Sequence, residues 1–124
     1  MSEVPGIVIV RERIDPAELK RLVLLYFEDM VKYVVDVERG VVGLGGDMHA
    51  DGEQLLLEDG SRQADLWGAN YYPGRGPGES IEYTSLINIR PAAGNRSMVV
   101  EDDAVRARIR QITHALIGMG EPLP

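Results

Sequence analysis

The sequence predicts an α+β domain with a mainly antiparallel sheet, and three features of the 124 residues lead to that prediction. A β-branched run lies near the N-terminus, two pairs of strand-like segments are each joined by turn residues, and two longer segments repeat apolar residues at helical spacing. We therefore expect a sheet built from two hairpins plus an N-terminal strand. Two amphipathic helices should cover one face, with one short helix in addition, leaving the other face free for a partner.

The composition is that of one globular domain spanning residues 1–124. Hydrophobic residues make up 44% of the chain and charged residues 27%, which separates it from disordered sequences. A chain of this length buries a usable core without disulfides. We expect residues 121–124 to form a frayed tail.

Cysteine content and charge exclude several functional classes. The sequence has no cysteine, which excludes thiolate catalysis, cysteine-ligated zinc and iron–sulfur clusters. Thirteen Lys and Arg stand against twenty Asp and Glu, a net charge of −7, so the average surface repels nucleic acid and anionic membranes. No apolar run is long enough to span a bilayer. We therefore expect a cytoplasmic protein that uses no cofactor and binds neither nucleic acid nor a membrane.

The first elements are a buried strand and a capped helix. Residues 7–10 read Ile-Val-Ile-Val, which predicts the strand. Asp15, Pro16 and Glu18 then combine an N-cap, a first-turn proline and a reciprocal carboxylate, the arrangement that starts a helix. Four apolar residues of this helix fall on one face and are assigned to the core: Leu19, Leu22, Val23 and Tyr26.

A hairpin is predicted around the Arg-Gly pair at residues 39–40, taken as a two-residue turn. Counting outward from this turn places Val35 opposite Leu44 and Lys32 opposite Asp47. The apolar residues of both strands then share one face. The turn and the hydrophobic pattern therefore agree on the register.

The rest of the chain predicts a short helix, a second hairpin and a final helix. Asp51 is suited to cap the short helix, and Gly60 to end it. Residues 66–72 and 81–89 read as strands joined by a loop rich in glycine and proline, with an edge strand at residues 98–100. Asp102 opens the C-terminal helix.

Four motifs in the middle and end of the chain resemble a known family. They are LLLEDGS at residues 55–61, LWGANYYP at 66–73, INIRP at 87–91 and NRS at 95–97. These motifs are similar to those of a family of short uncharacterised prokaryotic proteins, a domain of unknown function. The resemblance implies a stand-alone prokaryotic domain. Because the family has no assigned activity, no functional residue is carried over from it.

Asp47, His49 and Asp51 are the strongest candidates for chemistry. In an extended chain these alternate positions point the same way, and imidazole with carboxylates suits a transition metal. With Glu58 added, the spacing also approaches that of a calcium loop, although His49 and Leu55 replace the usual ligands at its third and ninth positions. The structural alternative is that Asp47 pairs with a lysine, Asp51 caps a helix and Glu58 is solvated.

A second candidate site is polar and lies later in the chain. Asn88 and Arg90 share the face of a predicted strand, and Arg96 lies in the loop beyond it. Together with His49 and Asp51, the two arginines would hold the carboxylate or phosphate of a small anionic ligand. The alternative is that both arginines neutralise the acidic chain internally.

Two function hypotheses follow. The first is a non-catalytic binding or assembly module that acts as a small homo-oligomer, which we expect to be a homodimer. Its partner surface would carry Trp67, Tyr71 and Tyr72, because alternation along the strand sends at least one of these aromatics to a surface. The second is a small metal-dependent hydrolase or anion-binding enzyme built on the Asp47, His49 and Asp51 run. Convergence of His49 with Arg90 and Arg96 would favour the enzyme.

Overall fold

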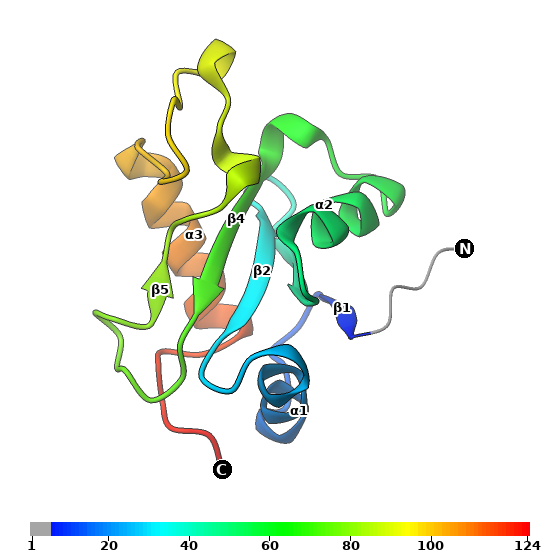
Figure 1. The fold of residues 1–124 in the computed structure, drawn as a ribbon, viewed down its shortest axis with the longest axis vertical. Coiled ribbons are helices and arrows are strands. Elements are labelled where there is room, and N and C mark those ends of the chain that lie inside the picture. Colours follow the sequence, from blue (N-terminus) through cyan, green and yellow to red (C-terminus); the bar gives the residue numbers. More distant parts are fainter. Residues whose placement is uncertain (1–5) are drawn as a thin grey trace.

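The computed structural model describes residues 6–124 and shows an α+β fold with a five-stranded antiparallel sheet, as predicted. The strand order is β1-β3-β2-β4-β5, so β1 and β5 form the two edges (Figure 1). The strands are β1 (Ile7–Val10), β2 (Val31–Asp36), β3 (Val41–Gly45), β4 (Leu66–Tyr71) and β5 (Ile81–Glu82). The helices are α1 (Pro16–Tyr26), α2 (His49–Glu58) and α3 (Asp103–Leu116), with short 3-10 turns η1 (Gln63–Asp65), η2 (Leu86–Asn88) and η3 (Pro91–Ala93).

The starts of α1 and α3 are set by aspartate caps, as the sequence predicts. The Asp15 carboxylate accepts a hydrogen bond from the N–H of Ala17 at 2.8 Å. The Asp102 carboxylate accepts from the N–H groups of Ala104 and Val105 at 2.8 and 3.1 Å. Each cap satisfies N–H groups that have no partner within a first helical turn.

One residue of the predicted α1 core face is placed differently. Leu19, Leu22 and Val23 are buried, but Tyr26 is 43% exposed. Tyr26 is the last residue of α1. The apolar spacing therefore predicts burial correctly for Leu19, Leu22 and Val23, but not for the last residue of the helix.

The predicted register of the first hairpin is wrong by two residues. Val35 lies opposite Val42, and Leu44 lies opposite Tyr33. Asp36 causes the shift, because its carboxylate accepts hydrogen bonds from the N–H groups of residues 38 and 39 at 3.0 and 2.8 Å. The connection is therefore the four-residue loop 37–40 instead of a two-residue turn. A shift of two residues keeps every side chain on its predicted face.

Lys32 consequently does not pair with Asp47. Strand β3 ends at Gly45, and Lys32 faces Asn70 on β4. Gly40 closes the loop at φ +69°, a backbone conformation that glycine adopts without strain.

The second hairpin joins β4 to β5, but β5 is only two residues long. The predicted strand 81–89 is wrong beyond Glu82, because the Ser85 hydroxyl accepts a hydrogen bond from the N–H of Ile87 and caps η2 there. The expected edge strand at 98–100 is reduced to a single bridge between Thr84 and Val99.

The main core lies between one sheet face and the two longer helices. Tyr33 and Tyr71 are among its largest buried side chains, and the Tyr33 hydroxyl meets the Thr113 hydroxyl of α3 at 2.7 Å. Both α1 and α3 contribute to this cluster, in agreement with the prediction that two helices share a face. Figure 1 shows α3 running behind β4.

The opposite sheet face is not free, contrary to expectation. Helix α2 packs on it through Leu56, which is fully buried against Val34 and Leu66. The approach is close because both elements carry glycine: a Cβ added at Gly43 would lie 3.3 Å from the carbonyl oxygen of Gly52. Part of this face is therefore used inside the chain.

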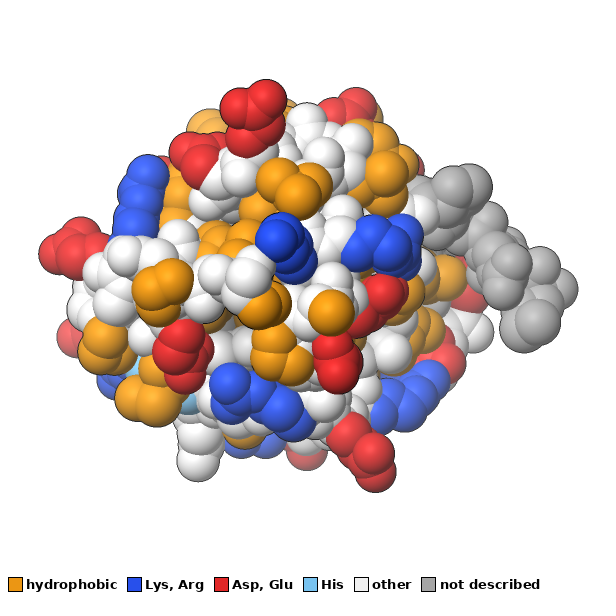
Figure 2. Space-filling model, turned by 90° about the horizontal axis from the view of Figure 1, so that it is seen from below, with side chains coloured by type: hydrophobic (Ala, Val, Ile, Leu, Met, Phe, Trp, Pro, Cys, Tyr) orange, Lys and Arg blue, Asp and Glu red, His pale blue; other side chains and the backbone are white. Residues whose placement is uncertain are grey.

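The surface around α1 and the C-terminal tail carries both signs of charge. Figure 2 views the molecule from this side and shows hydrophobic side chains in small groups between charged ones. Two hydrogen bonds connect the C-terminal tail to the rest of the chain. The Lys20 ammonium donates to the carbonyl oxygen of Pro124 at 2.6 Å, and the N–H of Gly74 donates to the carbonyl oxygen of Glu121 at 3.0 Å. Among residues 6–124, the helices are too short or too polar to cross a membrane.

Candidate functional site

The predicted metal run is broken where α2 begins. His49 is the first residue of the helix and Met48 is its N-cap residue, so the segment is not extended through Asp51. Asp51 lies in the first turn, exposed, and does not cap the helix as the structural alternative supposed. A carboxylate there still interacts favourably with the helix dipole.

His49 is anchored to the central part of the sheet. Its Nε2 atom lies 2.8 Å from the carbonyl oxygen of Ala69 on β4. A carbonyl only accepts, so Nε2 carries the proton and donates it. Burial lowers the pKa of His49, an effect opposed by this hydrogen bond and, to a smaller extent, by the Asn70 side chain. The ring is therefore held neutral, and its second nitrogen, Nδ1, is unprotonated.

Asn70 is the next residue along β4 and lies on the sheet face that α2 covers. Its Nδ2 group donates to the Glu82 carboxylate of β5 at 2.7 Å. Its Oδ1 atom is buried and has no hydrogen-bond partner among the described residues, while the whole residue is only 7% exposed. An unpaired buried acceptor is costly, of the order of 1–3 kcal/mol. Asn70 Oδ1 is therefore a group that a ligand would satisfy.

His49 and Asn70 line one pocket of about 290 Å³. Its mouth carries large apolar side chains that solvent reaches, with exposed fractions of 55% for Met48, 69% for Leu86 and 40% for Met98. The remaining residues that line it are Lys32, Ala50, Thr84, Ser85 and Ile87. The pocket thus combines an apolar rim with buried polar groups, the usual arrangement of a ligand site.

The predicted anion site is not assembled. Asn88 is fully buried and exchanges two hydrogen bonds with the backbone of Gly68, at 2.8 and 3.0 Å. Arg90 donates to the carbonyl oxygen of Leu66 and lies 3.6 Å from Glu53 of α2. These contacts hold the segment after β5 against the sheet, while Nη1 of Arg90 is buried without a hydrogen-bond partner among the described residues.

Arg96 and the remaining predicted ligands lie apart from this pocket. Arg96 is exposed, and its backbone N–H donates to Glu101 at 2.8 Å. Asp47 is also exposed, and Glu58 accepts a hydrogen bond from Gln54 at 3.3 Å. Within residues 6–124, no three His, Asp or Glu side chains are grouped as a metal site would require. His49 therefore meets Asn70 and Lys32 instead of the arginines.

The aromatics predicted at an interface are mostly internal. Trp67 and Tyr71 belong to the main core, with 7% and 1% exposure, and the Tyr71 hydroxyl accepts from the N–H of Gly120 at 2.9 Å. The Arg90 guanidinium stacks over the Trp67 ring, 4.8 Å from its centre. Tyr72 is half-buried, and Arg75 stacks on its ring at 3.9 Å. Trp67 and Tyr71 thus offer little surface to a partner.

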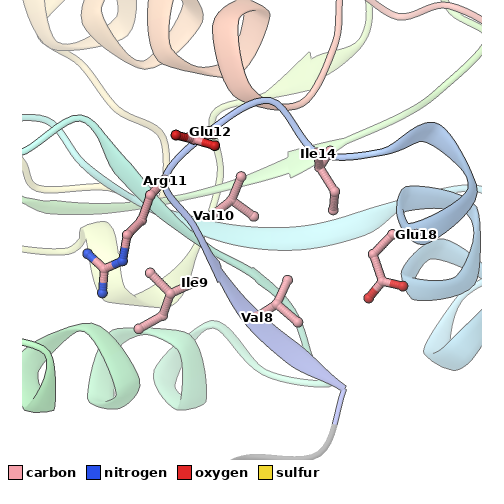
Figure 3. A pocket seen from close by; sticks show the side chains of 7 residues that line it. All are labelled: Val8, Ile9, Val10, Arg11, Glu12, Ile14 and Glu18. Atoms are coloured by element: carbon pink, nitrogen blue, oxygen red, sulfur yellow. The ribbon is translucent and has the colours of Figure 1, made fainter.

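A second hollow, of about 490 Å³, lies along the outer edge of β1. Figure 3 shows Val8 and Val10 on the side of the strand that faces Glu18 of α1, and Ile9 on the other side near Arg11. Val8 and Ile9 are only partly buried. The described part of the chain leaves this sheet edge without a neighbouring strand.

Reasoning from sequence did not identify Asn70, Lys32 or the rim as site residues. The sequence does contain a signal for Asn70, which lies within the apolar run 66–72. A buried amide there needs a hydrogen-bond partner, either from the chain or from a ligand. The rim offered none, since Met48 and Leu86 lie 38 positions apart in sequence and meet only through the pairing of β2 with β4.

The chain matches a known protein family. No curated protein and no solved structure matches the chain. The family described as "Protein of unknown function (DUF5674)" matches residues 8–116, nearly the whole chain. This agrees with the resemblance to an uncharacterised family noted from the sequence motifs. The chain belongs to the DUF5674 family of proteins of unknown function.

Proposed function

We propose that this chain is a non-catalytic binding module and that the pocket lined by His49 and Asn70 is its binding site. The observation that carries the proposal is the exposed apolar rim, in which Met48, Leu86 and Met98 surround one opening. Single exposed apolar side chains are ordinary on a protein surface, whereas a group of them around a pocket with polar walls marks an interaction site.

The pocket is held by ordered structure. His49 is bonded to β4, and η2 on the opposite wall is capped by Ser85 and braced by Asn88. A wall fixed in this way loses little conformational freedom when a ligand binds, so more of the interaction energy appears as affinity. The volume of about 290 Å³ is at the lower end of the range for ligand pockets, which favours a small ligand or one side chain of a larger one.

The test uses 4-methyl-2-pentanone, a small branched ketone, as a probe of the apolar rim. Nitrogen-15 labelled protein is titrated with the ketone and backbone amide shifts are followed. We expect saturable shifts confined to residues 48–50, 69–70, 84–87 and 98, with a dissociation constant on the order of 1 mM for so small a molecule. Non-saturable shifts, or saturable shifts elsewhere on the chain, would contradict the proposed site.

A matched pair of variants distinguishes ketone binding at the rim from nonspecific binding to exposed apolar side chains. Leu86→Ser removes the most exposed apolar side chain of the rim, and Met119→Ser removes an apolar side chain that is 45% exposed and lies outside the pocket. Because both side chains are exposed, both variants should fold. We expect Leu86→Ser to weaken ketone binding several-fold and Met119→Ser to leave it unchanged.

The assembly part of the hypothesis rests on a different feature, the free edge of β1 (Figure 3). An unpaired strand edge offers backbone N–H and C=O groups to another strand. Residues 7–10 are all β-branched, so an antiparallel copy would set β-branched side chains against each other, with Ile9 opposite its own equivalent. We propose a homodimer through β1, because Trp67 and Tyr71 are occupied in the core.

Sedimentation at increasing protein concentration tests the dimer. We expect Val8→Lys, which places a charge on this edge, to shift the protein to monomer. Leu24→Lys changes an α1 side chain that is 54% exposed and should leave the dimer intact. A wild-type protein that stays monomeric at high micromolar concentration would refute the dimer without affecting the pocket.

A further inference from the structure

We infer that the ligand of this pocket is a small neutral molecule that donates hydrogen bonds from one end and carries a short branched apolar group at the other, as an aliphatic primary carboxamide does. The inference rests on the proposed binding function and adds the chemical class of the ligand. It follows from which polar atoms of the pocket walls are still without a partner.

The orientation of the Asn70 amide is fixed by chemistry. Its partner Glu82 is a carboxylate, which accepts hydrogen bonds and does not donate them when ionised, so the amide nitrogen must face it. The oxygen Oδ1 is therefore the buried atom without a partner. Only a hydrogen-bond donor satisfies it.

His49 lies beside this acceptor, and the Asn70 side chain contributes to its pKa. Its Nε2 proton is committed to the carbonyl oxygen of Ala69 at 2.8 Å, so Nδ1 of the neutral ring has no proton to donate to Asn70. Both side chains line the same pocket. An amide NH₂ group of a ligand would supply the donor that Asn70 Oδ1 lacks.

The charged groups near the pocket disfavour an anion at this position. A carboxylate would present lone pairs to the acceptor Oδ1 of Asn70 and would lie near the Glu82 carboxylate, which already holds the Asn70 amide. Lys32 also lines the pocket, but its ammonium lies 5.3 Å from the centre of the Phe27 ring, which draws it toward that side. We therefore expect the neutral donor to bind better than the anion.

The experiment compares three probes that share an isobutyl group and a carbonyl. Isovaleramide carries NH₂ where 4-methyl-2-pentanone carries a methyl group, and isovalerate carries a charged oxygen. Titration of the labelled protein near pH 7.5 should rank them amide, then ketone, then carboxylate. We expect the amide to bind about fivefold more tightly than the ketone, the ratio that corresponds to roughly 1 kcal/mol for one hydrogen bond.

The variant Asn70→Leu keeps the shape of the side chain and removes the acceptor. Isovaleramide should lose its advantage over the ketone in this variant, while ketone binding persists. A melting curve shows whether the variant folds, and the wild-type ranking decides the question if it does not.

Each outcome has a distinct meaning. Equal affinities for all three probes, or tightest binding of isovalerate, would overturn the ligand class and leave the pocket as the binding site. Preference for the amide that survives in folded Asn70→Leu would also overturn the assignment. Absence of saturable binding for every probe would reject the ligand class and the proposed function together.

Discussion

The His49 imidazole donates a hydrogen bond from Nε2 to the carbonyl oxygen of Ala69 at 2.8 Å, linking the first turn of α2 to the middle of β4. The bond spans 20 residues of sequence and fixes both the tautomer of the ring and one wall of the pocket. A histidine held neutral in this way couples the stability of the fold to pH.

Stability should decrease as pH falls from about 7.5 to about 5.5. The pKa of His49 is lowered in the folded chain, chiefly by burial, below its ordinary value near 6.5. The unfolded chain therefore binds a proton at a higher pH than the folded chain, and the contribution of His49 is lost as pH falls through the unfolded pKa toward the folded one. Urea unfolding at several pH values measures this slope.

The variant His49→Gln isolates the effect, because its amide can still donate to the Ala69 carbonyl but does not titrate. We expect a smaller loss of stability over the same pH interval than in the wild type. The other histidine is replaced in parallel, in His114→Gln, so that its share of the wild-type pH slope is measured separately. Equal slopes in wild type and His49→Gln would show that His49 does not titrate differently on folding.

The buried Tyr33 and Thr113 hydroxyls should show strong energetic coupling. Thr113 donates to the carbonyl oxygen of Ile109 at 2.7 Å, so the Tyr33 hydroxyl is the donor in its own 2.7 Å bond to Thr113. Tyr33→Phe should cost about 1 kcal/mol, and Thr113→Val more, because it leaves a buried hydroxyl proton unpaired. The double variant should be less destabilised than the sum of the single ones in a denaturant cycle. Additive costs would exclude this bond.

Two glycines with similar backbone conformations should respond differently to alanine. Gly45 has φ +108° and Gly60 has φ +103°, but a Cβ at Gly45 would collide with the carbonyl oxygen of Gly6, whereas one at Gly60 meets nothing within 4 Å. Gly60→Ala should cost about 1–2 kcal/mol from the backbone alone. Gly45→Ala should cost clearly more, because β1 must also move. Similar unfolding midpoints would argue against this close approach.

Divalent metals should not raise the melting temperature. His49 has its Nε2 committed to Ala69, and Asp47 and Asp51 are exposed without a third ligand grouped with them in residues 6–124. Specific binding would stabilise the fold in proportion to the logarithm of metal concentration. A concentration-dependent increase with Ca²⁺, Mn²⁺ or Zn²⁺ that disappears in Asp51→Ala would restore the metal hypothesis.

Local signals in the sequence predicted the starts of α1 and α3, but the predicted Asp51 cap of α2 was wrong. Asp15 and Asp102 cap their helices because a side chain two or three residues from the N–H it satisfies leaves little to tertiary structure. The predicted register of the first hairpin was wrong for a related reason. Asp36 also bonds locally, to the N–H groups of residues 38 and 39, and this lengthened the loop that the Arg-Gly pair alone suggested.

The candidate site is formed by contacts between segments that are distant in the sequence, and the sequence does not indicate which segments meet. The pairing of β2 with β4 puts Lys32 opposite Asn70. The sequence of neither strand indicates that the two are neighbours in the sheet. The polar residues Asn88 and Arg90 attracted a functional interpretation, yet their hydrogen bonds go to the backbone of β4. Buried amides and guanidinium groups that bond to the backbone are the same residue types as those of a binding site. Only the three-dimensional structure distinguishes the two cases.

The side-chain amide of Asn70 provides the most direct measurement of the binding account. Its NH₂ group gives nitrogen-15 signals that sense the charge on Oδ1, and those signals are identified by their loss in Asn70→Leu. On titration with isovaleramide, the account predicts that they shift saturably, with the same dissociation constant as the backbone amides of residues 48–50 and 84–87. Saturable shifts at those backbone amides with the Asn70 side-chain signals unmoved would contradict the claim that Oδ1 recognises the ligand.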